Sequence, residues 1–138
     1  MRMRALFACL AALALVGGTL YAREGPPQDQ PKIDELLNAP LAGEAGKEVD
    51  IKIYTFAPGT VLPWHIHPDA HEFVYQLEGT LTLEFEGQAT REVKAGEAVY
   101  VPPNVVHRGS NRSPTEPAKL HVVRVKPRDK PLTENVPR

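Results

Sequence analysis

Three histidines and one glutamate have the residue types and spacing of a transition-metal site. His65 and His67 are one residue apart, Glu72 follows shortly after, and His107 comes later in the chain. Imidazole suits Zn, Cu, Fe and Ni, while a carboxylate shifts the set toward Fe, Mn or Ni chemistry. A divalent ion with one carboxylate ligand keeps roughly one net positive charge, which favours anionic substrates. If the ion is six-coordinate, two positions stay open for water, substrate or dioxygen.

Strands and turns are the elements that can bring these four side chains together. Side chains alternate between the faces of a strand, so His65 and His67 point the same way. The Pro68-Asp69-Ala70 stretch is typical of a turn, and a following strand can return Glu72 to their side. Antiparallel pairing of a later strand can add His107. Two histidines alone are often surface residues, so the spacing by itself leaves both readings open.

Two glycine-bounded blocks surround these residues and resemble a known family. Gly59 to Gly79 reads G-x5-H-x-H-x4-E-x6-G, and Gly96 to Asn111 reads G-x5-P-x-N-x2-H-x3-N. Both blocks are similar to the two conserved motifs of the cupin superfamily. The second departs at Asn104, where the family pattern has glycine; asparagine tolerates the left-handed turn that glycine would supply.

The resemblance implies an all-β fold, a double-stranded β-helix or jelly-roll barrel, with the metal inside near one mouth. Carried over by position, the ligands are His65, His67, Glu72 and His107, and the cofactor is a divalent Mn, Fe, Ni or Cu ion. Glu72 can double as a catalytic base by loosening from the metal. The resemblance also implies a homodimer.

The rest of the chain is consistent with short strands and turns. Alternating residues predict strands at 49–53 and 81–85, Glu86-Gly87-Gln88 predicts a hairpin turn, and a last strand is expected over 119–126. Pro31 to Leu37 is predicted to form a short N-terminal helical segment. The 14 prolines and 10 glycines favour such a turn-rich fold.

The N-terminal residues predict export. Arg2 and Arg4 precede an apolar run from Ala5 to Leu20, typical of a secretory signal peptide cut after Ala22. Localisation is therefore expected to be periplasmic or secreted. The predicted organisation is a signal peptide at 1–22, a leader and short helix at 23–45, a cupin barrel at 46–128 and a C-terminal tail at 129–138.

Several residues near the motifs have two readings. His71 alternates away from Glu72 and reads as a rim or surface residue, whereas Gln76 shares the face of Glu72 and either lines the pocket or is a satisfied core amide. Tyr54 either packs in the core or donates a proton near the cavity. Asn111 reads as a structural hydrogen-bonding residue.

Three functions fit these observations. The first is a metal-dependent oxidoreductase, similar to a dioxygenase, that acts on a small organic molecule; a metal-dependent lyase or isomerase would use the same ligands. The second is a non-catalytic periplasmic protein that binds metal or a small ligand. The third, a metal-free sugar isomerase or epimerase, is disfavoured by the complete ligand set. The net charge of −1 gives no indication of nucleic-acid binding, and no membrane association is expected after signal cleavage.

Overall fold

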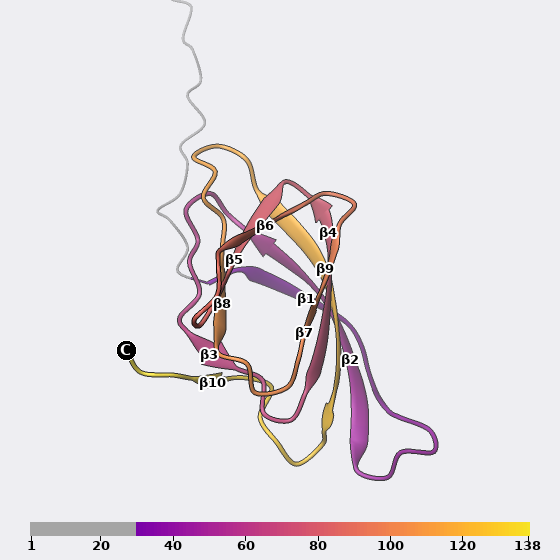
Figure 1. Cartoon of the computed structure of the whole chain (residues 1–138). Helices are drawn as coiled ribbons and strands as arrows, with labels where there is room; N and C mark the ends of the chain where they lie inside the picture. Colours follow the sequence, from indigo (N-terminus) through magenta and orange to yellow (C-terminus); the bar gives the residue numbers. More distant parts are fainter. Residues whose placement is uncertain (1–29) are drawn as a thin grey trace, which may run out of the picture.

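The computed structural model describes residues 30–138, which form two facing antiparallel sheets (Figure 1). The first sheet has the order β1 (Lys32–Pro40), β2 (Lys47–Phe56), β9 (Ala118–Pro127), β4 (His71–Glu78) and β7 (Ala98–Val101). The second has the order β10 (Glu134–Asn135), β3 (His65–Ile66), β8 (His107–Ser110), β5 (Thr80–Phe85) and β6 (Arg91–Lys94). The predicted signal peptide and nearly all of the leader lie outside the described residues.

The inward faces of the two sheets meet in a core that is apolar at one end and charged at the other. On β9 the buried side chains alternate with half-buried ones, and they run from Leu120 through Val122 to Arg124. On β2 the buried Phe56 and Tyr54 lie toward the apolar end, and the buried Asp50 lies toward the charged end. The interior of the barrel therefore offers both apolar walls and a place for charged groups.

The helical segment predicted at Pro31 to Leu37 is wrong, because these residues lie in or directly before strand β1. Lys32–Pro40 pairs along β2, with a bulge between Glu35 and Leu37. The prediction rested on Pro31 at a favoured first helical position, but the backbone hydrogen bonds of an available sheet edge outweigh weak local propensity. Among the described residues no helix forms, so none there is long and apolar enough to cross a membrane.

Two tight turns that the motifs require are present. Gly79, between β4 and β5, has a φ of 68°, and a Cβ at this position would lie 2.3 Å from the carbonyl oxygen of Pro117. Asn104 adopts a φ of 62°, as expected for the residue that replaces the motif glycine. These turns return β4 to β5 and β7 to β8, and they bring the histidine strands together.

Candidate metal centre

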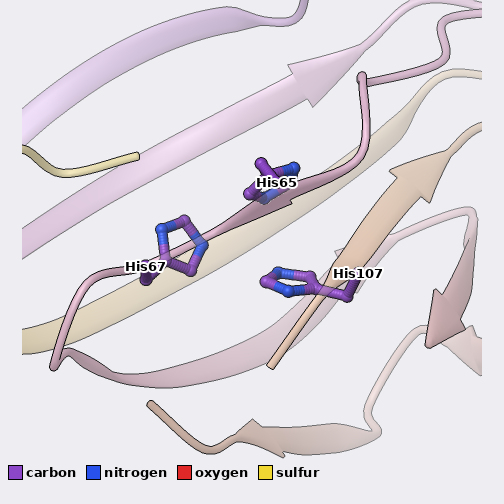
Figure 2. Close-up of side chains that lie close together, drawn as sticks. All are labelled: His65, His67 and His107. Atoms are coloured by element: carbon purple, nitrogen blue, oxygen red, sulfur yellow. The ribbon is translucent and has the colours of Figure 1, made fainter. Parts of the chain in front are cut away.

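The three histidines of the two motifs form one buried cluster on β3, β8 and the loop after β3. His65 pairs directly with His107 across the sheet, and His67 lies two residues further along. Their ring centroids are 4.4 to 5.1 Å apart, and one ring nitrogen from each lies within 4.8 Å of the others. Figure 2 shows the three rings gathered around a common point.

Backbone carbonyls fix the orientation of all three imidazoles. The Nδ1 atoms of His65, His67 and His107 donate to the carbonyl oxygens of Pro63, Leu132 and Val105, at 2.8, 2.7 and 2.8 Å respectively. A carbonyl oxygen only accepts, so each neutral ring carries its proton on Nδ1 and leaves a lone pair on Nε2. Such a bond on the second nitrogen is the usual support of a metal-ligating histidine.

Glu72 lies beside this cluster from strand β4. Its Oε2 is 2.9 Å from Nε2 of His67, and its Oε1 is 3.7 Å from Nε2 of His107. The Nε2 atom of His67 has no hydrogen-bond partner among the described residues. A lone pair facing a carboxylate is repulsive unless a cation lies nearby, so this donor set fits a divalent metal.

Arg124, which the sequence does not mark as a site residue, binds Glu72 from strand β9. Both Nε and Nη2 of Arg124 lie 2.6 Å from Oε2 of Glu72, and Nη1 donates to the Tyr54 hydroxyl at 2.9 Å. Burial alone would raise the pKa of Glu72, but the guanidinium charge of Arg124 holds it well below its usual range. Glu72 is therefore ionised, with Oε2 occupied by Arg124.

Burial also affects His65. Loss of hydration and the neighbouring His107 lower the pKa of His65 to about 4. At neutral pH this imidazole is thus neutral, with its proton on Nδ1 and a lone pair on Nε2 that can bind a metal. The buried position of Arg124, in contrast, is hard to predict from the sequence. There it is only a cation among the apolar residues of the last strand, and many such cations lie on the surface.

A cavity of about 40 Å³ adjoins the centre inside the barrel. A single water needs about 10–15 Å³ of such space, so a few water-sized groups fit. The cavity has charged or ligating groups on one side and apolar walls on the other. Its lining includes His65, Glu72, His107, Arg124, Tyr54, Phe56, Val74, Leu81, Leu83 and Val122.

The structure also settles the orientation of the neighbouring residues. His71 faces outward, with Nδ1 2.7 Å from the Tyr100 hydroxyl, as strand alternation predicted. Gln76 is fully buried and donates to the Glu78 carbonyl, so it lies on the predicted inner face but outside the cavity lining. Asn111 is structural: it donates to the carbonyl of Phe56 and to one other backbone carbonyl.

Comparison with known proteins agrees with this geometry. The cupin domain model matches residues 52–124. The chain belongs to the cupin family. Germin-like protein subfamily 2 member 4 of Arabidopsis thaliana is 32% identical over 84 residues, 58% of this chain and 38% of that protein. This cupin therefore covers about two fifths of the length of that germin-like protein. It also covers about two fifths of the length of a second curated relative.

Solved structures share the barrel of this cupin. A protein with a double-stranded β-helix domain from Klebsiella pneumoniae has a TM-score of 0.63 at 19% identity, covering 83% of this chain and 90% of that chain. A recombinant oxalate oxidase, solved in complex with glycolate, has a TM-score of 0.57 at 28% identity, covering 70% of this chain and 51% of that chain. The all-β, double-stranded β-helix fold predicted from the motifs is confirmed.

Proposed function

We propose that this cupin is a metal-dependent oxidoreductase that acts on a small organic acid. The observation that carries the proposal is the convergence of three Nε2 lone pairs beside an ionised glutamate in a small buried cavity. His65, His67 and His107 would hold a divalent Mn, Fe, Ni or Cu ion, with Glu72 as fourth ligand through Oε1. The ion would supply Lewis-acid and redox chemistry.

The charge and size of the cavity support a small anionic substrate. A divalent ion, the carboxylate of Glu72 and the guanidinium of Arg124 together carry a charge of about +2. Asp50, which lies 3.8 Å from Arg124, reduces this charge to about +1. The limited volume excludes bulky molecules. Similarity to an oxalate oxidase that binds glycolate supports the same substrate class and an oxidative reaction.

The residues of the chain have separate roles in this proposal. Arg124 keeps Glu72 ionised and holds Oε2, which leaves Oε1 as the oxygen that would ligate or accept a proton from the substrate. Apolar residues such as Phe56 and Leu83 line the other side of the cavity and limit the entry of water.

A homodimer and export are part of the proposal. The outer face of the first sheet exposes Phe73, Tyr75 and Tyr100 by 45–47%, and three large rings together support a protein contact. A second copy of the chain is the partner that we propose. The predicted signal peptide supports delivery to the periplasm or the medium.

Elemental analysis tests the metal centre. Protein purified without a histidine tag should contain about one Mn, Fe, Ni or Cu ion per chain, since four buried protein ligands would retain the ion during purification. The double variant His65→Ala/His107→Ala should contain none. His71→Ala, which removes an outward-facing histidine, is the matched control and should retain the ion.

Oxygen consumption tests the reaction. The metal-loaded protein should consume dioxygen with oxalate or glycolate and not with neutral molecules of similar size. Metal binding without turnover on a panel of small acids would instead support the alternative function, a non-catalytic metal-binding module. Absence of metal, with none taken up on addition, would contradict both.

A further inference from the structure

The last residues of the chain return to the metal centre. After β9 ends at Pro127, residues 128–138, here called the C-terminal strap, run back along β3 (Figure 1). Asn135 pairs with His65, Glu134 pairs with Ile66, and the Val136 N–H donates to the Trp64 carbonyl at 2.8 Å. The strap thus forms the strand next to β3, which carries His65 and leads into the loop that carries His67.

The strap supports one histidine differently from the other two. The acceptors of His65 and His107 lie two residues earlier in the chain, so these rings are fixed locally. The acceptor of His67 is the carbonyl of Leu132, 65 residues later, and the Thr133 hydroxyl lies 3.4 Å from the same Nδ1. Only His67 of the three depends on the strap for its orientation.

Mostly exposed contacts hold the strap in place. Leu132 and Val136 are half-buried, and the other residues of the strap are exposed. Ion pairs of Lys130 with Asp69 and of Arg138 with Glu86 lie on the surface, where such pairs contribute about 0–1 kcal/mol. A segment with so little burial opens at a lower free-energy cost than the barrel strands.

We propose that the strap is a positioning segment that sets the tautomer of His67 and thereby controls metal retention. The second half of this inference rests on the proposed metal centre. When the strap lifts, Nδ1 of His67 loses its acceptor, and the ring becomes free to rotate and to carry its proton on Nε2. An imidazole protonated on Nε2 offers no lone pair to the centre at that atom.

Two variants test the strap. Val136→Pro keeps the chain length but removes the N–H that donates to Trp64, and deletion of residues 131–138 removes the Leu132 carbonyl. Val136→Ala is the matched control, because it retains the N–H. Long-range ¹⁵N–¹H NMR of the metal-free proteins reports the tautomer of each histidine, and competition with a chelator reports Co(II) affinity and release.

We expect His67 to be protonated on Nδ1 in the native chain and in Val136→Ala, and to exchange between tautomers in both test variants. His65 and His107 should keep their Nδ1 protons. Co(II) affinity should fall by about 10–100-fold, the usual effect of losing the hydrogen-bond partner of a ligating histidine.

An unchanged His67 tautomer in folded Val136→Pro and in the deletion variant would overturn the inference. So would equal loss of the native tautomer at all three histidines of a folded variant, because the strap would then have no specific role at His67. If no variant, including the native chain, binds Co(II), the proposed metal centre fails, while the metal-free tautomers still decide the role of the strap. Circular dichroism establishes folding; if the deletion unfolds the barrel, Val136→Pro decides.

Discussion

At the scale of single residues, the pair of Arg124 and Glu72 is the most consequential addition to the predicted site. Both side chains are buried, with relative exposures of 5% and 4%, and Arg124 also binds Tyr54. Burying an ion pair costs desolvation energy. Removing only one of its partners nevertheless strongly destabilises the folded protein, because the other charge is left buried without compensation. The pair therefore constrains the site before any ion binds.

Replacement of Arg124 tests this constraint. Arg124→Met should lower the free energy of unfolding of the metal-free protein by about 3–5 kcal/mol, because Glu72 is left as an uncompensated buried charge. Addition of a divalent ion should recover part of the loss by supplying positive charge. Urea denaturation with and without metal measures both effects. The double variant Arg124→Met/Glu72→Gln is the control, and a loss in Arg124→Met no larger than in the double variant would contradict the expectation.

His65 should make the stability of the metal-free protein depend on pH. Its pKa is about 4 in the folded protein against 6.5 in the unfolded chain, so the unfolded state binds more protons between these values. Stability should therefore fall by roughly 3 kcal/mol as pH drops from 6.5 to about 4.

Denaturation midpoints at several pH values measure this slope. His65→Gln should flatten it, because glutamine does not titrate. The contribution of Glu72 to the pH dependence can be separated from that of His65. Because the pKa of Glu72 is lowered, protonation of this carboxylate reduces the stability of the protein only below pH 4.5. An equal slope in His65→Gln would refute the assignment.

The three histidines could be predicted as metal ligands from the sequence, because imidazole is a common metal ligand and their spacing is visible along the chain. The sequence could not predict the acceptor of His67, since every residue has a backbone carbonyl and Leu132 is chosen only by the path of the strap. Arg124 was missed because its direction depends on which face of β9 turns inward, and both faces of that strand are largely apolar.

At the scale of elements, the turn between β4 and β5 requires glycine for two reasons. Gly79→Ala should be destabilising by about 1–2 kcal/mol for the left-handed backbone and by about 1–3 kcal/mol more for contact with the Pro117 carbonyl. Gly87→Ala is the matched control, with φ of 70° and nothing within 4 Å of an added Cβ. Thermal or chemical unfolding should show a clearly larger loss at Gly79; equal losses would contradict the contact.

Strand prediction succeeded where turns bounded an alternating run and failed at the N-terminal edge. The hairpin at Gly87 and the strands Lys47–Phe56 and Thr80–Phe85 follow from local sequence. In Lys32–Pro40 no alternation is visible, because the strand is exposed on both faces and interrupted by a bulge. Only the free edge of β2 selects the extended form, and that edge is a tertiary feature.

At the scale of the whole molecule, the apolar outer face bears on assembly. If a second copy covers it, Tyr75→Glu should shift the protein toward monomer by placing a charge in the contact. Sedimentation velocity at several concentrations measures this. Glu92→Lys on β6, in the opposite sheet, is the control and should leave the mass unchanged. A native chain that sediments as a monomer at all concentrations would refute the dimer.

The double-stranded β-helix was predictable through the resemblance of the two motifs to the cupin family, whereas alternation and turns alone predicted only short strands. The composition of the interior was not predictable. Asp50 and Lys126 are buried although their neighbours in sequence are more apolar, and that inversion follows from pairing across β2 and β9 rather than from local pattern.

The bond between His67 and Leu132 has a consequence for the order of events in biogenesis. It closes a loop of 65 residues, so nearly all of the described chain must be synthesised before the third imidazole is set. A growing chain that had folded only through β9 would present two fixed imidazoles and one unfixed. If the proposed metal centre binds an ion, its selection would therefore follow synthesis of the strap, and the compartment where folding finishes would determine which ion is bound.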